Sequence, residues 1–253
     1  MNKEINDYKE ILINIFNKIE KEESSISKGA EVIANAIMGE QVIHVIGPGG
    51  HSNIAAEELL WRAGVLVPIN SLLEPGINLI HGAKRSNIIE RTPGYGIKVL
   101  DAYSVGKKEG EVIIIVNAYG INPLCIDIAL ETKKRNVKSI GVTSQSFAKE
   151  ISKDHPSRHP SGKNLYEIVD VFIDNHLPLG DSVIEIKGCE QKVAPTSTLC
   201  NIFTLHCLII EAVKKLVDKG VKPPVWKSAN MPKGDEANKK YEEKYAHQIK
   251  HLW

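Results

Sequence analysis

The sequence has little that would place the protein in an oxidising compartment or in a membrane. Its four cysteines form no CxxC pair, and no His/Cys/Asp cluster has metal-ligand spacing, so we expect no disulfide scaffold and no bound metal. No apolar run approaches the ~18 residues that a membrane span needs. The opening residues, MNKEINDYKE, include acids that a signal peptide lacks. We therefore predict a cytoplasmic protein with reduced cysteines, which are Cys125, Cys189, Cys200 and Cys207.

The sequence also has almost no net charge. Its 32 Lys and Arg residues nearly balance 31 Asp and Glu residues, which leaves a formal charge of +1. No global field then favours nucleic acid or a membrane surface, and we expect neither as a partner. The length of 253 residues fits one large α/β domain or two small ones.

Both ends of the chain differ from the middle. Apolar residues at helical spacing predict a helix over residues 4–22 and a second one from Ser24 to Gly39. We predict that residues 1–40 are a helical extension that packs on the core or on a partner subunit. One α/β domain would span residues 41–220. The highly charged residues 221–253 would be a tail that contains a solvated helix.

Between these ends, apolar strands alternate with helices, which indicates βαβ units around a parallel sheet. We predict strands at 42–46, 65–69, 169–175 and 183–186, and strands that open into polar turns within 112–120 and 139–146. Helices are predicted at 52–63, 122–135 and 196–217, with short helices near 76–81 and 95–105. The fold class is therefore α/β, doubly wound, with three α/β/α layers. The helix over 196–217 is apolar nearly all round, which favours burial in the core or against a second subunit, and we predict a homodimer or larger assembly.

Small and polar residues follow three of the strands and begin the helix at 196. In a doubly wound sheet, ligands bind beyond the carboxyl ends of the strands, where backbone N–H groups and hydroxyls can surround an anion. The alternative is that these residues only form turns and helix caps. The glycine run is not a P-loop, because no GK[ST] follows it, and it is a poor dinucleotide fingerprint. The residues that we expect to bind the ligand are Gly47, Gly49, Gly50, His51, Ser52, Asn117, Tyr119, Gly120, Asn122, Thr143, Ser144, Thr196, Ser197 and Thr198.

Three stretches resemble the SIS (sugar isomerase) domain family over roughly residues 26–217. They are VIHVIGPGGHS, VIIIVNAYGINPLCIDIALETKKRNVKSIGVTS and the helix after APTST. The stretches PSRHPSGKNLYEIVDVFIDNHLPLGDSV and PPVWKSANMPKGDEAN resemble stand-alone members labelled UPF0309. The resemblance implies a five-stranded parallel sheet, a sugar phosphate as ligand and no cofactor. It also implies homodimers or homotetramers whose sites are completed by a neighbouring subunit.

The sequence departs from the family pattern at two places. Asn117-Ala118-Tyr119 stands where the family has serines, and Asn201 stands near the position of a catalytic His in phosphoheptose isomerases, while His206 would be a core residue. We therefore keep three readings: a sugar-phosphate isomerase that acts through an enediolate, a non-catalytic phosphosugar sensor, and a lyase. The lyase reading rests on the similarity of residues 195–198 to the GSTR stretch of N-acetylmuramic acid 6-phosphate etherases.

An isomerase or lyase of this kind needs a base in a partly dry pocket. We rank the candidates Glu74, His51, Glu90 and His81. Glu74 comes first because it follows the second strand, at the edge of the sheet where ligands bind. Two further hypotheses concern loops: that residues 157–163, which include Arg158, His159 and Lys163, clamp an anion, and that Asp181 orients a sugar hydroxyl.

Overall fold

The computed structural model describes residues 3–253. Its centre is a five-stranded, fully parallel sheet in the order β2-β1-β3-β4-β5. The strands are β1 (Ile43–Ile46), β2 (Ile69–Ser71), β3 (Val112–Val116), β4 (Lys138–Thr143) and β5 (Val171–Asp174). β1 and β3 are buried along their whole length, as expected of a sheet with helices on both faces. The predicted doubly wound α/β fold with a five-stranded parallel sheet is confirmed.

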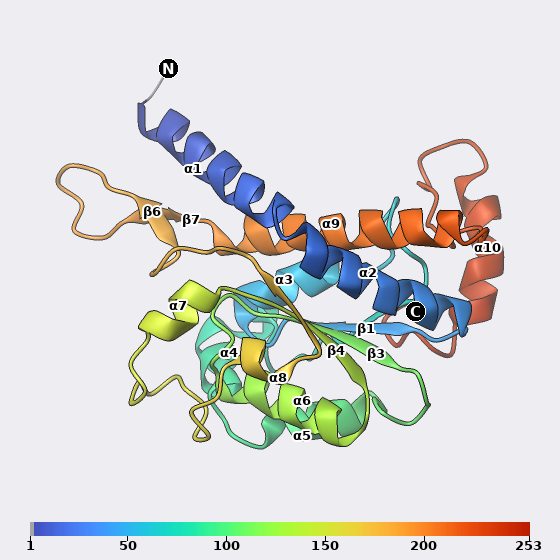
Figure 1. Ribbon diagram of the computed structural model, residues 1–253, viewed down its shortest axis with the longest axis horizontal. Helices are drawn as coiled ribbons and strands as arrows, with labels where there is room; N and C mark the ends of the chain where they lie inside the picture. Colours follow the sequence, from blue (N-terminus) through green and yellow to red (C-terminus); the bar gives the residue numbers. More distant parts are fainter. Residues whose placement is uncertain (1–2) are drawn as a thin grey trace.

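Helices cover both faces of the sheet (Figure 1). The first face packs on α2 (Glu23–Met38), α3 (Gly50–Glu58) and α9 (Ser197–Asp218), and the second on α5 (Tyr95–Ala102), α6 (Pro123–Lys134) and α8 (Leu165–Ile168). Alternate residues of β3 supply the two cores, since Ile114 packs among the first helices and Ile113 among the second. The remaining elements are α1 (Lys3–Glu20), the 3-10 helix η1 (Leu79–His81), α4 (Ala83–Glu90), α7 (Gln145–Glu150), β6 (Ser182–Ile184), β7 (Val193–Pro195) and α10 (Gly234–Tyr245).

One strand boundary was wrong and one helix was missed. The second strand begins at Ile69 rather than at residue 65, because Pro68 has no N–H to donate and only its carbonyl accepts from Ile43. The strand predicted at 183–186 is confirmed as β6, which pairs antiparallel with β7 in a hairpin apart from the parallel sheet. α4 was not predicted, because its sequence AKRSNIIE has no apolar periodicity.

The C-terminal tail packs more closely than a solvated helix would. Trp226, Tyr245 and Ile249 are buried against Val42 and Val67 of the main domain. One face of α10 is therefore part of the fold, while its charged residues lie mostly on the other face. Within residues 3–253, no helix combines the length and apolar composition that crossing a bilayer requires.

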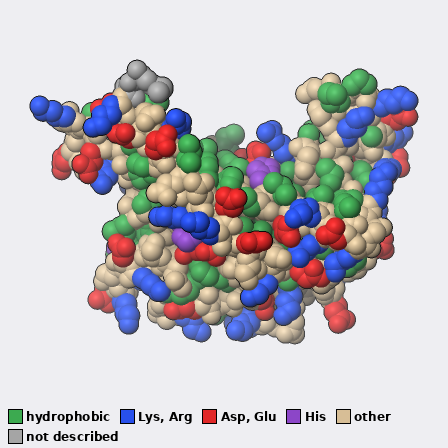
Figure 2. Space-filling view, turned by 45° about the horizontal axis from the view of Figure 1, so that its top comes forward, with side chains coloured by type: hydrophobic (Ala, Val, Ile, Leu, Met, Phe, Trp, Pro, Cys, Tyr) green, Lys and Arg blue, Asp and Glu red, His purple; other side chains and the backbone are tan. Residues whose placement is uncertain are grey.

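The face over α9 carries exposed apolar side chains. Leu199, Ile210 and Val217 of α9 are all exposed. Figure 2 shows hydrophobic side chains gathered in a hollow between the two raised ends of the molecule. These side chains are consistent with the predicted homodimer or homotetramer, which stays a prediction for a single chain.

Candidate functional site

A cavity of about 190 Å³ lies at the carboxyl ends of β1 and β3. Six segments of the chain meet there, as expected at the crossover point of a doubly wound sheet. Its lining residues are Gly49, Gly50, His51, Ser52, Glu90, Arg91, Asn117, Ala118, Tyr119, Ile121, Asn122, Ser157, Asp181 and Ser197. The structure thus brings together eight of the predicted binding residues, the candidate base Glu90 and Asp181, and adds others that the sequence did not single out.

The glycine turn is shaped by close packing of its own backbone. A Cβ on Gly47 would lie 2.0 Å from the Ser52 carbonyl oxygen, and one on Gly50 would lie 2.4 Å from Leu79 Cδ2. Gly49 is the N-cap of α3 and supplies no side-chain cap. The first-turn N–H groups of α3 are therefore left for water or a ligand at the cavity wall.

Ser52 is the side chain in this turn best placed for a ligand. It is only 7% exposed, and its hydroxyl has no hydrogen-bond partner among residues 3–253. The hydroxyl oxygen is not one of the fully buried polar atoms without a partner, so it is accessible from the cavity, where a ligand atom or water can complete its bonding.

Two asparagines hold the glycine turn from the neighbouring loop. The side-chain amides of Asn117 and Asn122 both donate to the carbonyl of Pro48, at 2.9 and 2.8 Å. Asn122 also caps α6 by accepting from the N–H of Cys125. Both residues line the cavity as predicted, and their amide groups are already committed to shaping it.

Several predicted binding residues point elsewhere. The Ser144 hydroxyl donates to the carbonyl of Leu177 at 2.8 Å and caps α7. Thr143 is fully buried, 3.5 Å from the carbonyl of Ala118. The predicted residues that do not line the cavity are Gly47, Gly120, Thr143, Ser144, Thr196 and Thr198.

Asp181 occupies the N-terminus of α9. Its carboxylate accepts from the backbone N–H groups of Thr196 and Ser197, at 2.9 and 2.7 Å, and from both hydroxyls. This carboxylate supplies the capping interactions that an anion would otherwise supply there. The α9 terminus is therefore occupied, whereas the α3 terminus is open.

Of the candidate bases, Glu90 is the carboxylate that lines the cavity. Burial raises its pKa to about 7, and the nearby Arg91 charge only partly opposes that effect. Its Oε2 lies over the backbone of Gly49, where a Cβ would approach it to 2.9 Å. A carboxylate with a pKa near neutrality is suited to take up and release protons at physiological pH.

The other candidate bases are placed differently. His51 lines the cavity and is exposed. Glu74 lies outside the cavity lining, and its Oε1 accepts from the Tyr95 hydroxyl at 2.6 Å and from the N–H of Gly76 at 3.0 Å. His81 ends η1, is exposed and does not line the cavity. The geometry thus favours Glu90, which the sequence ranked third.

The structure also adds residues to the lining and reassigns two others. Arg91, Ala118 and Ile121 line the cavity and were missed, although each is adjacent to a residue that the sequence had singled out, and Ser157 lines it from the loop at 157–163. Arg158 donates to three backbone carbonyls and to Asn164, so it anchors its loop and clamps no anion. The expectation that His206 is a core residue was wrong, because its side chain is 36% exposed and lies 3.4 Å from Glu58.

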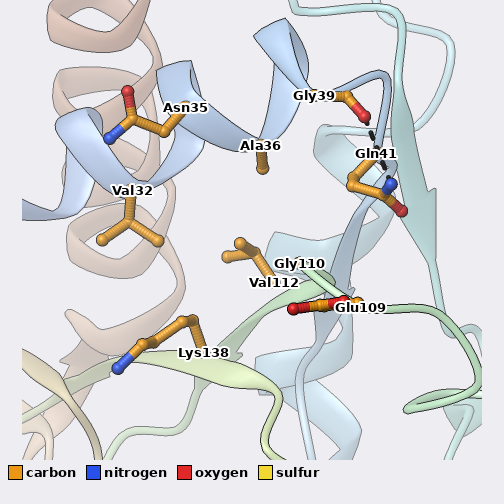
Figure 3. Close-up of a pocket in the computed structure, with 9 residues that line it drawn as sticks. All are labelled: Val32, Asn35, Ala36, Gly39, Gln41, Glu109, Gly110, Val112 and Lys138. Carbon is orange, nitrogen blue, oxygen red and sulfur yellow. Dashed lines mark hydrogen bonds between the residues drawn. The ribbon is translucent and has the colours of Figure 1, made fainter.

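A second cavity of about 520 Å³ lies at the opposite, amino edge of the sheet (Figure 3). Val32 and Ala36 of α2 face Val112 of β3 across it, and Lys138 borders it from β4. Its lining residues are Val32, Asn35, Ala36, Gly39, Gln41, Glu109, Gly110, Val112 and Lys138.

The chain belongs to the SIS domain family. The family model matches residues 7–144. Among similar proteins, a UPF0309 protein of Geobacillus thermodenitrificans is 36% identical over 231 residues, which are 91% of this chain and 90% of that protein. A UPF0309 protein of Thermoanaerobacter pseudethanolicus is 36% identical over 251 residues, or 96% and 99% of the two chains.

Two solved structures share the fold at low sequence identity. A phosphoheptose isomerase from Neisseria gonorrhoeae aligns with a TM-score of 0.54 at 14% identity, covering 83% of this chain and 97% of that one. A phosphoheptose isomerase from Francisella tularensis aligns with a TM-score of 0.53 at 14% identity, covering 85% and 100%. At this identity the likeness concerns the fold.

Proposed function

We propose that the protein binds a sugar phosphate at the carboxyl-edge cavity and isomerises it between aldose and ketose forms. The observation that carries this proposal is the position of Glu90. A carboxylate whose pKa is about 7 lies directly over an uncapped helix N-terminus, in one cavity. Such a base beside an anion site is what proton abstraction from a phosphorylated carbonyl compound requires.

The phosphate would lie at the N-terminus of α3. There it would accept from the first-turn N–H groups and from the unpartnered Ser52 hydroxyl. Arg91 would add a positive charge, since no carboxylate among residues 3–253 lies within ion-pair distance of it. The N-termini of α6 and α9 are already capped by Asn122 and Asp181, which favours α3.

The chemistry would then follow from Glu90. Its carboxylate takes the proton from the carbon next to the carbonyl, and the electron pair of that C–H bond forms the enediolate double bond. The carbonyl oxygen takes the negative charge, and Glu90 returns the proton to the neighbouring carbon. The cavity of about 190 Å³ is smaller than the ~300–1,000 Å³ of ligand pockets in general, so it would hold the phosphate and the reacting carbons, with the remaining sugar outside.

One observation favours a non-catalytic binding module instead. Asn201, at the position that a His occupies in phosphoheptose isomerases by resemblance, is 1% exposed and accepts from Asn175 at 2.7 Å. It lies outside the cavity lining and could not move a proton. A binding module would use the same cavity and the same phosphate contacts, but Glu90 would have no chemical role.

Glu90→Gln separates the two functions, because it keeps the shape of the side chain and removes its basicity. The substrates are fructose 6-phosphate, ribulose 5-phosphate and a heptulose 7-phosphate in D₂O. We expect wild type to exchange a substrate C–H proton and to turn over, with a rate that rises with pH up to about 7. Glu90→Gln should lose both by roughly 100- to 10,000-fold, the range for general base catalysis.

Thermal stabilisation by the same sugar phosphates should persist in the variant, because binding does not need the base. Glu74→Gln, which changes a carboxylate outside the cavity, is the matched control and should keep wild-type exchange. Binding without exchange in wild type would refute the isomerase and leave the binding module. Exchange that survives in Glu90→Gln would move the role of base to another residue.

A further inference from the structure

The sequence contains the tripeptide His-Pro-Ser twice in succession, as His155-Pro156-Ser157 and His159-Pro160-Ser161. Both copies form the same turn. In the first, Nδ1 of His155 lies 3.2 Å from the N–H and 2.6 Å from the hydroxyl of Ser157. In the second, Nδ1 of His159 lies 3.0 and 2.7 Å from the corresponding atoms of Ser161.

This geometry fixes the direction of the hydrogen bonds. A backbone N–H can only donate, so Nδ1 of each histidine accepts and carries no proton. The serine hydroxyl must then donate its proton to the same nitrogen. The oxygen of Ser157 is left with its lone pairs free, and its proton is already directed at a base.

The two copies differ in what surrounds them. Ser157 lines the carboxyl-edge cavity together with Glu90, whereas Ser161 is exposed and does not line it. His159 is largely buried and its Nε2 lies 3.2 Å from Asp127. His155 is exposed, and no carboxylate among residues 3–253 lies within ion-pair distance of it. Only the first copy connects the cavity to an imidazole that has no carboxylate partner among the described residues.

The loop that carries the first copy is firmly held. The Arg158 guanidinium donates to the carbonyls of Ser152, Ala148 and Ile151 and to the side chain of Asn164. The N–H of His159 donates to the carbonyl of Ile121, which itself lines the cavity. Ser157 is thereby kept at the cavity wall by the two anchored residues that follow it, as a reacting group must be.

We propose that Ser157 and His155 form a proton relay that moves the hydroxyl proton of the sugar, while Glu90 moves its carbon-bound proton. This inference rests on the proposed isomerase function. Aldose–ketose isomerisation needs both transfers, because one oxygen loses a proton as the other gains one. A single carboxylate that shuttles a proton between two carbons leaves the oxygen-to-oxygen transfer unassigned.

The relay step balances without any further reactant. After Glu90 has taken the carbon-bound proton, the former carbonyl oxygen carries the negative charge. Ser157 Oγ takes the proton of the neighbouring hydroxyl as it passes its own proton to Nδ1 of His155. The imidazolium returns a proton through the same hydroxyl to the charged oxygen. Serine and histidine end in their starting states, and the substrate is left ready for reprotonation at carbon.

Two variants test the relay, and the second copy provides the control. Ser157→Ala removes the hydroxyl. His155→Asn places an amide oxygen where Nδ1 lies, so the turn can still form by accepting the same N–H, but no proton can be carried. Ser161→Ala removes the equivalent hydroxyl from the copy that does not line the cavity. Each protein is assayed with fructose 6-phosphate, ribulose 5-phosphate and a heptulose 7-phosphate.

We expect Ser157→Ala and His155→Asn to lower net isomerisation on the order of 100-fold, the lower end of acid–base contributions. Both should still exchange the carbon-bound proton in D₂O at close to the wild-type rate, because Glu90 is untouched. Ser161→Ala should match wild type in both measurements. This pattern, exchange without turnover, is what a merely structural role for the loop would not produce.

Three results would overturn the relay. Wild-type turnover in Ser157→Ala or His155→Asn would show that neither group is needed. An equal loss of exchange and turnover would show that Ser157 positions the substrate for Glu90 instead. A wild-type protein that binds the sugar phosphates but neither exchanges nor isomerises them would refute the isomerase function itself, and the relay with it.

Discussion

The two edges of the sheet offer cavities of opposite character. The amino-edge cavity, at about 520 Å³, is more than twice the size of the carboxyl-edge one at about 190 Å³. Yet two of its polar side chains already have partners within the protein. Gln41 donates to the carbonyl of Gly39, and Lys138 pairs with Asp170 at 3.3 Å. The smaller cavity holds the unpartnered Ser52 hydroxyl and a carboxylate with a raised pKa.

The difference follows from the direction of the strands. In a parallel sheet every strand runs toward the same edge, so the helices that follow begin there and turn their N–H ends toward it. α3 and α9 both begin at the carboxyl-edge cavity, whereas the amino-edge cavity meets the end of α2 at Gly39. Cavity size therefore does not identify the chemical site in this fold. The site is identified by polar groups without protein partners that line one cavity.

The largest effect is expected on the affinity for a sugar phosphate. It should differ between Ser52 and Ser144, two serines that both follow strands. Ser52→Ala should weaken binding of a sugar phosphate by about 1.5–3 kcal/mol, the value of a hydrogen bond to a charged group, or roughly 10- to 150-fold in Kd. Ser144→Ala should leave Kd within about twofold, because that hydroxyl already donates to Leu177. Isothermal titration calorimetry measures both values.

Any effect of Ser144→Ala on Tm must be separated from its effect on binding, because the hydroxyl also caps α7. The phosphate-free sugar provides the second control and should bind poorly to all three proteins. If Ser144→Ala weakened binding more than Ser52→Ala, the phosphate would belong at α7 and the assignment to α3 would be wrong.

A smaller effect should appear in the stability of the protein. Because the folded state holds the pKa of Glu90 near 7, it retains a proton that the unfolded chain releases from about pH 4.5 upward. The free energy of unfolding should therefore fall as the pH rises through this window. Glu90→Gln removes that cost and should stabilise the protein by about 1–3 kcal/mol at pH 8, with no gain near pH 4.

Urea denaturation at the two pH values measures the difference. Glu109→Gln at the amino edge is the matched control, because that side chain is exposed and should change stability by less than about 0.5 kcal/mol at either pH. A Glu90→Gln protein that was no more stable than wild type at pH 8 would mean that burial does not raise this pKa.

The sequence predicts the sheet and the glycine turn because their signals are local. The apolar run at 112–116 predicts a strand and the glycines at 47–50 predict a turn, each from a pattern that lies within a few residues. The role of each polar residue depends on distant partners instead. Ser144 faces inward because the Leu177 carbonyl, 33 residues away, accepts from it, and Ser197 is capped by Asp181 across 16 residues.

Glu90 shows the same limit most clearly. Its helix has no apolar periodicity, so no pattern in the sequence places Glu90 at the ligand edge ahead of Glu74. The raised pKa of Glu90 comes from burial where α4 meets the glycine turn, which only the fold brings together. Glu74 follows a strand as predicted, but its carboxylate accepts a hydrogen bond from the Tyr95 hydroxyl, 21 residues further along the chain.

The smallest effect on binding and turnover is expected from a substitution in the amino-edge cavity. A large effect there would contradict the assignment of ligand binding to the carboxyl edge alone. Figure 3 shows Ala36 on the face of α2 that looks across the cavity toward Val112. Ala36→Leu would fill part of this space with a residue of good helix propensity, so we expect the variant to fold and to keep its Tm within a few degrees. Its Kd for the sugar phosphate and its turnover should stay within about twofold of wild type, because no group at the carboxyl edge contacts it.

If Ala36→Leu instead weakened binding tenfold or more, a value of about 1.4 kcal/mol, the two edges would be coupled through the sheet. The larger cavity would then be a regulatory site.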